Sequence, residues 1–164
     1  MLVITAENPV RDFIDMKVKF FLSALFLVFI CNCRRNNPTE AIPTGPVNVT
    51  LDLNLLDYQH LLVPGSFVYA EGGAKGVIII HDYDDAWYAF ERTCAWQPLN
   101  ACSKIWVDTQ SIQLKCGGYA SNNRFEACCD SRYSFNGLPV KGPAAGVLAR
   151  YNVSRNGNLL YVYN

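Results

Sequence analysis

Apolar and polar residues alternate strictly in one stretch of this chain. Val47, Val49, Leu51, Leu53 and Leu55 are separated from one another by single polar residues. A two-residue period of this kind is typical of a β-strand with one buried face. The pattern therefore predicts that a folded domain opens at about residue 47.

Short β-rich runs follow as far as the C-terminus, separated by turn-forming residues. They occupy residues 66–70, 76–82, 86–92, 104–108, 111–115, 147–153 and 159–163. Asn156-Gly157, between the last two runs, is a strong hairpin signal because both residue types tolerate positive φ. Neither a helical period nor an internal repeat stands out. Residues 47–164 are therefore predicted to form an all-β domain of short antiparallel hairpins.

A different pattern precedes this domain. Residues 16–33 start with Met16, include two lysines, continue as a mostly apolar run and end with Cys31 and Cys33. The run is too short to cross a bilayer comfortably, and its basic start is typical of a secretory signal. A cysteine directly after the run suggests a bacterial lipoprotein signal, in which Cys33 or Cys31 is acylated. An ordinary cleaved signal with incidental cysteines is the alternative.

The flanking segments complete the division of the chain. Residues 1–15 place acidic side chains ahead of the lysines, so Met16 is expected to be the true start. Residues 34–46 hold three prolines without periodicity and predict an extended tether. Export would place the domain of residues 47–164 in the bacterial cell envelope, on the periplasmic side or as an outer-membrane lipoprotein. The acyl chains would hold it on the membrane without spanning it.

Charge and cysteine content narrow the function. The formal net charge is zero, so the chain lacks the basic footprint of a nucleic-acid-binding protein. Beyond the tether there are five cysteines: Cys94, Cys102, Cys116, Cys128 and Cys129. In an oxidising compartment such cysteines are more often disulfides than catalytic thiols. Their odd number leaves at least one unpaired.

Two cysteine-containing segments carry a resemblance to a known family. Residues 87–96 read Trp-Tyr-Ala-Phe-Glu-Arg-Thr-Cys-Ala-Trp, and residues 126–137 read Glu-Ala-Cys-Cys-Asp-Ser-Arg-Tyr-Ser-Phe-Asn-Gly. Lys-Gly-Pro-Ala follows at 141–144. Together these segments resemble a Rieske domain, in which two cysteines and two histidines on two loops hold a [2Fe-2S] cluster.

This resemblance covers residues 66–164 and implies a specific all-β fold. The fold has stacked antiparallel sheets and a small two-loop subdomain of the kind that carries the cluster. Gly142, Pro143 and Ala144 are expected to pack over the two cysteine loops, as the corresponding loop does in the family.

The family's cluster ligands are mostly replaced. Aligned without a gap, the four ligand positions fall on Cys94, Trp96, Glu126 and Cys129. An indole nitrogen has no lone pair for a metal, and a carboxylate oxygen suits an iron–sulfur cluster poorly. We therefore expect no cofactor, with Trp96 filling the volume of the cluster. A [2Fe-2S] cluster with atypical ligands such as Cys94 and Cys129 is the alternative.

The same alignment implies how the cysteines pair. A disulfide that links the two loops in many Rieske proteins would join Cys102 and Cys128. Cys94 and Cys129 would face each other and can form a second disulfide, which leaves Cys116 over. Each unstrained bridge would stabilise the fold by roughly 2–4 kcal/mol. A zinc site built from the four paired cysteines would lack the usual C-x-x-C spacing.

These observations favour a function without catalysis. A membrane-anchored, Rieske-like lipoprotein without the usual ligands would act as a binding or structural module, with an unidentified envelope protein as its partner. Electron transfer through an atypical cluster competes with this interpretation. A thiol-redox function of Cys128 and Cys129 is a third, although such enzymes usually carry C-x-x-C at a helix start. His60 and His81 occupy no motif position and are expected to be surface or strand-end histidines.

Overall fold

The computed structural model describes residues 40–164. The predictions for residues 1–15 and 16–33, including acylation of Cys33 or Cys31, lie outside the described residues. Within the described part there is no helix long and apolar enough to span a membrane. The elements are β1 (Asn48–Asp52), the 3-10 helix η1 (Gln59–Leu62), β2 (Ser66–Ala70), β3 (Val77–His81), β4 (Trp87–Glu91), β5 (Ile105–Asp108), β6 (Gln113–Tyr119), β7 (Phe125–Tyr133), β8 (Pro139–Lys141), β9 (Arg150–Asn156) and β10 (Leu159–Tyr163).

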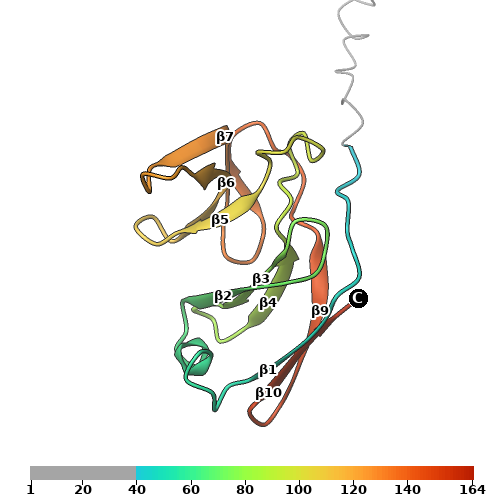
Figure 1. Cartoon of the computed structure of the whole chain (residues 1–164), viewed down its shortest axis with the longest axis vertical. Helices are drawn as coiled ribbons and strands as arrows, with labels where there is room; N and C mark the ends of the chain where they lie inside the picture. Colours follow the sequence, from blue (N-terminus) through green and yellow to red (C-terminus); the bar gives the residue numbers. More distant parts are fainter. Residues whose placement is uncertain (1–39) are drawn as a thin grey trace, which may run out of the picture. The chain divides into compact units, whose positions relative to one another are not determined.

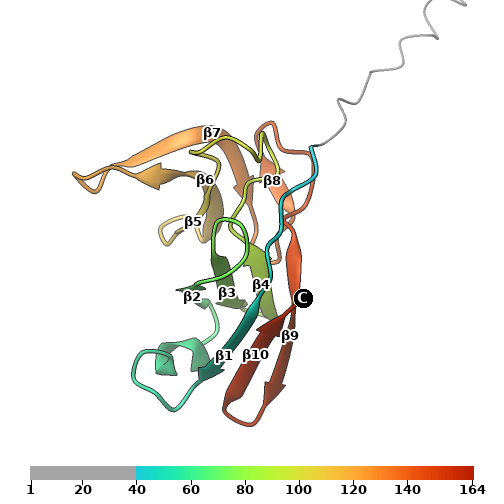
Figure 2. The same cartoon turned by 45° about the vertical axis from the view of Figure 1, so that its right-hand side comes forward.

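These strands form two antiparallel sheets, which confirms the predicted all-β class. The larger sheet has the order β1-β10-β9-β4-β3-β2, and the smaller has the order β5-β6-β7-β8. The smaller sheet is inserted in the sequence between β4 and β9, and it lies at one end of the larger sheet (Figures 1 and 2). The subdomain expected from the resemblance therefore corresponds to this four-stranded insertion.

Strand β3 is buried on both faces and divides the interior into two cores. Ile78 and Ile80 belong to a cluster that reaches the smaller sheet, whereas Val77 and Ile79 pack on the other face. All four side chains are fully buried. Burial of each aliphatic side chain of this size contributes roughly 1.5–3 kcal/mol, so this short run anchors the fold.

The alternating stretch that opens the domain forms a strand that is shorter than predicted. Strand β1 ends at Asp52, because the Asp52 carboxylate accepts a hydrogen bond from the Asn54 backbone N–H at 2.9 Å and turns the chain. Leu53 is still buried, but Leu55 is 54% exposed. The last residues of the pattern therefore belong to a turn and not to the strand.

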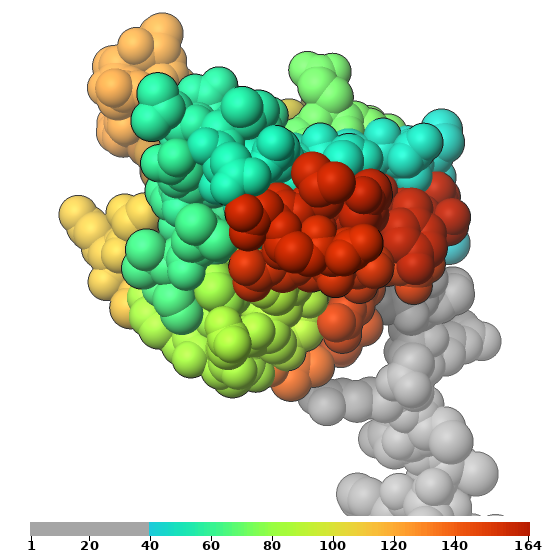
Figure 3. Space-filling model, turned by 90° about the horizontal axis from the view of Figure 1, so that it is seen from below, coloured from blue at the N-terminus to red at the C-terminus, as the bar shows by residue number. Residues whose placement is uncertain are grey.

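The predicted C-terminal hairpin is present. Strand β9 pairs with β10, and Leu159 lies opposite Asn156 across the turn. Gly157 supplies a positive φ of 58° there. Figure 3 shows this hairpin beside β1 and the segment that contains η1. The Asn158 side chain donates to the Asn54 side chain at 2.7 Å, which ties the two turns together.

Arg92 joins the two sheets. Its guanidinium carbon lies 3.8 Å from the ring centre of Tyr69 on β2 and 4.3 Å from that of Trp106 on β5. Its Nε donates to the Ile105 carbonyl at 3.0 Å. The Tyr69 hydroxyl accepts from the Val107 N–H at 3.0 Å. Stacking and hydrogen bonds of this kind fix the smaller sheet against the end of the larger one.

Candidate metal centre

Strand β4 leads the chain directly to the first cysteine. Cys94 follows Thr93, which bridges to Lys104, and its side chain is fully buried. The loop that follows turns back, and the Cys94 N–H donates to the Ser103 carbonyl at 3.3 Å. The strand and this return of the loop fix the direction of the Cys94 side chain.

Lys75, in the turn between β2 and β3, holds this first loop together. Its Nζ donates to the carbonyls of Pro98, Asn100 and Ser103 at 2.9, 2.5 and 2.9 Å. Partial burial lowers the pKa of Lys75, while the neighbouring Cys116 and Cys94 act to raise it. The ammonium group is thus a positive charge close to the cysteines.

A disulfide joins the first loop to β7. It links Cys102 and Cys128, whose Cα atoms lie 5.4 Å apart. This is the pairing that the resemblance implied. Since Cys128 is bonded, the structure does not provide the adjacent Cys128 and Cys129 thiols of the thiol-redox interpretation. The described structure also lacks the zinc site of Cys94, Cys102, Cys128 and Cys129, because two of these four cysteines are bonded to each other.

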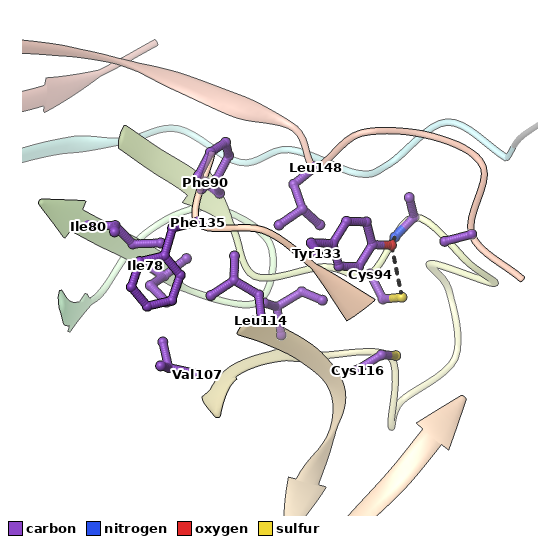
Figure 4. Close-up of a cluster of buried hydrophobic side chains, with 13 residues drawn as sticks. Ile78, Ile80, Phe90, Cys94, Val107, Leu114, Cys116, Tyr133, Phe135 and Leu148 are labelled. Atoms are coloured by element: carbon purple, nitrogen blue, oxygen red, sulfur yellow. Dashed lines mark hydrogen bonds between the residues drawn. The ribbon is translucent and has the colours of Figure 1, made fainter. Parts of the chain in front are cut away.

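The remaining three cysteines of the described residues converge. The sulfur atoms of Cys94, Cys116 and Cys129 all lie within 4.8 Å of one another. Those of Cys94 and Cys129 are 3.9 Å apart and not bonded, so the second disulfide expected from the resemblance is absent from the described structure. Cys116, expected to be left over, is the third member. We call Cys94, Cys116 and Cys129 the three-thiol site; Figure 4 shows Cys94 and Cys116 at the edge of the core.

A large bulge in the smaller sheet brings Cys116 into the site. Lys115 pairs with Arg132 and Gly117 pairs with Ala127, so Cys116 alone lies opposite the four residues 128–131 of β7. Bulges of this kind bend a strand and re-aim its side chains. Gly117 permits the close approach, because a Cβ there would collide with the Glu126 carbonyl.

The bulge also explains why sequence reasoning missed Cys116. The resemblance predicts a loop from residue 126, whereas residues 125–133 form one strand with an irregular register. The available signal was the pair Gly117-Gly118 directly after Cys116. Glycines inside a strand pattern often mark a bulge or a close backbone approach.

Hydroxyl groups of the smaller sheet surround the thiols. The Tyr133 hydroxyl lies 3.5 Å from the Cys94 sulfur and accepts from the Ala95 N–H at 3.2 Å (Figure 4). On the other side, the Cys129 sulfur lies 3.2 Å from the Ser131 hydroxyl. The Ser131 oxygen in turn accepts from the Ala144 N–H at 3.1 Å. These contacts fix two of the three sulfurs.

The Gly-Pro-Ala loop lies against the bulge. Ala144 is buried, and Gly142 has a φ of 93°. A side chain at Gly142 would collide with the backbone of Asp130 and Ser131. The loop after β8 therefore supports the strand that carries Cys129.

The hydrogen bonds of the site concentrate negative charge on Cys94. A hydrogen bond from the Cys116 thiol lowers the pKa of Cys94 to about 5, with further help from the Tyr133 hydroxyl and against the effect of burial. The same interaction raises the pKa of Cys116. Burial and the Cys94 charge raise the pKa of Tyr133. Of Cys94 and Cys116, Cys94 is therefore the cysteine that loses its proton more readily.

Trp96 and Glu126 do not join the site. The Trp96 side chain is 36% exposed, so the expectation that it fills a buried volume is wrong. The fully buried Tyr133 lies against Cys94 instead. The Glu126 side chain is 61% exposed and pairs with Arg124 at 3.4 Å. Of the four aligned ligand positions, only Cys94 and Cys129 come together.

The two histidines are also engaged elsewhere. His81 is buried, and its ring nitrogens lie 2.8 Å from the Leu61 carbonyl and 2.7 Å from the Asp85 carboxylate. The exposed His60 ring lies 3.0 Å from the Phe67 carbonyl. His81 is therefore a buried strand-end residue, and the described structure offers no imidazole to the three thiols.

This donor set does not fit a Rieske cluster. Such a cluster needs two ligands on each of two irons, with both imidazoles on one iron. Ligands that share one ion through bonds of about 2.3 Å lie roughly 3.8 Å apart in a tetrahedron. The 3.9 Å between Cys94 and Cys129 is the spacing of two ligands on the same ion. The three thiols thus suit one ion rather than a two-iron pair.

Comparison of the sequence with family models and with curated proteins found no match. Two solved structures are similar to this chain at 18% identity and a TM-score of 0.43, each over 72% of this chain. One is the ferredoxin of carbazole 1,9a-dioxygenase from Nocardioides aromaticivorans IC177, covered over 96% of its length. The other is a chain in the complex of reduced oxygenase and oxidized ferredoxin in carbazole 1,9a-dioxygenase, and 92% of that chain is covered. Similarity at this level identifies neither a family nor a function.

Proposed function

We propose that this chain is an exported, lipid-anchored binding module, built on a Rieske-like frame whose cluster site has become a three-thiol site. The observation that carries this proposal is the convergence of Cys94, Cys116 and Cys129 within 4.8 Å. Two positions that would complete a cluster, Trp96 and Glu126, have exposed side chains. The module binds a ligand and performs no catalysis of its own.

The residues behind the resemblance support the Rieske-like frame, because each has a role at this site. Ser131 contacts Cys129, and Tyr133 contacts Cys94. Gly142 allows the following loop to approach β7, and Ala144 donates to Ser131. A frame of this kind positions two loops against each other whether or not the ligands on them suit iron.

The N-terminal pattern supports export and anchoring. Residues 16–33 have the composition of a lipoprotein signal, and residues 34–46 that of a tether. The disulfide between Cys102 and Cys128 is compatible with an oxidising compartment, where such bonds persist. The module's partners are then the membrane, through acyl chains on Cys33 or Cys31, and an envelope protein.

Cluster content tests the proposed site. The full chain is produced with iron and sulfide available and purified without oxygen, and its visible spectrum, iron and acid-labile sulfide are measured. We expect a colourless protein without stoichiometric iron or sulfide. Two irons and two sulfides per chain would instead establish an electron carrier with atypical ligands and would refute the proposal.

Acylation tests the anchor separately. Cells that produce the full chain are grown with labelled palmitate, and incorporation is compared with that of Cys33→Ala and Cys31→Ala variants. Label in the wild-type chain and its loss in one variant would identify the modified cysteine. An unlabelled wild-type chain would refute the lipid anchor and leave the three-thiol site to be judged on its metal content.

A further inference from the structure

We propose that Cys94, Cys116 and Cys129 together bind a single thiophilic d10 cation, Zn²⁺ or Cu⁺, through their three sulfurs. The inference rests on the proposed function, because it names the ligand class of the same three-thiol site. No carboxylate or imidazole of the described residues joins these sulfurs. An all-sulfur donor set selects zinc or copper(I) over hard cations such as Mg²⁺ and Ca²⁺.

The separation of the sulfurs is close to that of a finished site. Zinc–sulfur bonds of about 2.3 Å place tetrahedral ligands roughly 3.8 Å apart. Cys94 and Cys129 are already 3.9 Å apart, and Cys116 lies within 4.8 Å of both. A side-chain adjustment below about 1 Å brings the third sulfur to bonding distance.

The backbone around the site is already fixed, which lowers the cost of binding. Cys102–Cys128 locks the first loop to β7, and the bulge opposite Cys116 aims the third thiol at the other two. The Ser131 and Tyr133 hydroxyls hold the sulfurs of Cys129 and Cys94. A preorganised first shell with fixed neighbours is what a metal site requires.

Three protein ligands leave a fourth tetrahedral position for zinc. The Ser131 hydroxyl lies 3.2 Å from the Cys129 sulfur and the Tyr133 hydroxyl lies 3.5 Å from the Cys94 sulfur, so one of these hydroxyls or a water molecule can supply the fourth ligand. Copper(I) is satisfied by the three sulfurs alone. A cavity of about 90 Å³ borders Cys116, Cys129 and Ser131 on one side of the site. Cys129 is only half-buried, so a cation or a water molecule can reach the sulfurs from this side.

Charge balance favours zinc over copper(I). Three thiolates with Zn²⁺ carry a net charge of −1, whereas the same thiolates with Cu⁺ carry −2. Lys75 places a positive charge near Cys94 and Cys116, and its ammonium is fixed by three carbonyls of the first loop. Lys115 and Arg132, which both pair with Asp108, line the cavity beside Cys116 and Cys129. The zinc complex has the smaller net negative charge and is therefore less costly to hold in a largely buried site.

Binding of Zn²⁺ has a simple proton balance. Zinc binds the three cysteines as thiolates, so any proton that a sulfur carries must leave when its Zn–S bond forms. Three Zn–S bonds form as the remaining thiol protons pass to water, without oxidation or reduction. Binding therefore weakens as the pH falls, because protons compete with zinc for the sulfurs.

The test is a metal titration of the full chain, reduced at these thiols and handled without oxygen. Zn²⁺, Cu⁺ and Co²⁺ are added in competition with a chromophoric chelator, and bound metal is counted per chain. Co²⁺ reports its own ligands, since thiolate coordination produces an intense charge-transfer band. We expect one Zn²⁺ per chain and a cobalt spectrum of thiolate type.

Matched variants assign the binding to these residues. Cys116→Ser and Cys129→Ser should each weaken zinc binding at least tenfold and reduce the cobalt charge-transfer band. The Cys31→Ala/Cys33→Ala double variant, which alters the cysteines outside the domain, should bind zinc as the wild type does. Trp96→Phe, at an aligned ligand position whose side chain is exposed, should also be unchanged. Circular dichroism and the unfolding midpoint establish that each variant is folded.

The outcomes separate this inference from the proposed function. If the wild type binds one Zn²⁺ or one Cu⁺ per chain and Cys116→Ser loses that ion, the inference is supported and the cation is identified. A folded, colourless, reduced protein that binds neither ion refutes the inference and leaves the binding module in place. Stoichiometric iron and acid-labile sulfide refute both. Zinc that disappears only in the Cys31→Ala/Cys33→Ala variant refutes the assignment to the domain.

Discussion

The sulfur of Cys94 lies 3.9 Å from the sulfur of Cys129, although one follows β4 of the larger sheet and the other lies on β7 of the smaller sheet. This contact depends on the junction of the two sheets, which the Cys102–Cys128 disulfide and the Arg92 stack both secure. Changes at that junction should therefore alter the chemistry of the thiols as well as the stability of the fold.

Removal of the disulfide should destabilise the domain. Closing a loop across a sequence separation of 26 residues restricts the unfolded chain and contributes roughly 3 kcal/mol. The Cys102→Ser/Cys128→Ser variant should unfold at correspondingly lower denaturant, as measured by chemical denaturation of the full chain. The Cys31→Ala/Cys33→Ala variant is the control for loss of two cysteines as such. Equal midpoints for all three proteins would mean that the bridge does not hold the first loop.

Loss of the Tyr133 hydroxyl should raise the pKa of Cys94. That hydroxyl donates to the Cys94 sulfur and stabilises the charged form. In Tyr133→Phe, the thiolate absorbance of Cys94 should develop at a higher pH than in the wild type, because the pKa of Cys94 rises when this hydrogen bond is lost. The Cys94→Ser variant, which lacks this thiolate, assigns the signal to Cys94. An unchanged midpoint would remove Tyr133 from the electrostatics of the site.

The same ionisation should make stability depend on pH. The pKa of Cys94 is lower in the folded than in the unfolded protein, so its contribution is fully present above the unfolded value of about 8.5. It is lost as the pH falls through about 5. Cys116 behaves in the opposite way, since its raised pKa adds stability that is lost above its unfolded value. The free energies of unfolding of the metal-free wild type and of Cys94→Ser should differ most near pH 8.5. Free energies that change with pH in parallel in the two proteins would contradict a lowered pKa of Cys94.

Replacement of the buried Glu91 should weaken the support of the first loop. Its carboxylate accepts hydrogen bonds from the N–H groups of Ala74 and Lys75 at 2.6 and 2.9 Å, and from the hydroxyls of Thr93 and Tyr151 at 3.0 and 2.8 Å. Glu91→Gln turns amide hydrogens toward some of these donors. The free energy of unfolding of Glu91→Gln, measured by denaturation, should be roughly 2–4 kcal/mol lower than that of the wild type.

The exposed Glu71 provides the matched control for that substitution. Glu71→Gln makes the same chemical change on the surface and should alter the free energy of unfolding by less than about 0.5 kcal/mol. Similar losses in the two variants would show that the hydrogen bonds of Glu91 are unimportant. The Glu91→Gln variant should also bind Zn²⁺ more weakly, because Lys75 is positioned through the same turn.

Gly142→Ala should distort the bulge that carries Cys129. The new Cβ would collide with the backbone of Asp130 and Ser131, and the residue would keep an unfavourable positive φ. Gly157→Ala is the matched control, because Gly157 also has a positive φ but has open space for a Cβ. Gly142→Ala should lower the free energy of unfolding clearly more than Gly157→Ala, which should lower it by about 1 kcal/mol. Equal costs would mean that the loop shifts without disturbing β7.

Local patterns predicted the strands better than the site. The runs that became β2, β3, β4 and the C-terminal hairpin have regular alternation or dense β-branched residues, and their pairing is regular. The resemblance of two short segments to a Rieske domain predicted the disulfide between Cys102 and Cys128. Such features are encoded by residues close together in the sequence.

The three-thiol site depends instead on register, which a local pattern does not contain. Cys116 meets Cys94 only because one residue of β6 opposes four residues of β7. Trp96 is exposed because the first loop turns its backbone toward Cys94, to whose sulfur the Trp96 N–H donates at 3.5 Å, and leaves its ring at the surface. An alignment position specifies neither of these orientations.

Ala89 on β4 pairs with Tyr151 on β9, although the whole smaller sheet intervenes between them in the sequence. The chain thus leaves the larger sheet and returns to it at adjacent points. Substitutions, insertions or deletions in the smaller sheet can then accumulate without a change in the hydrogen bonds that close the larger one. Such an arrangement allows evolution to exchange one binding chemistry for another on an inherited support.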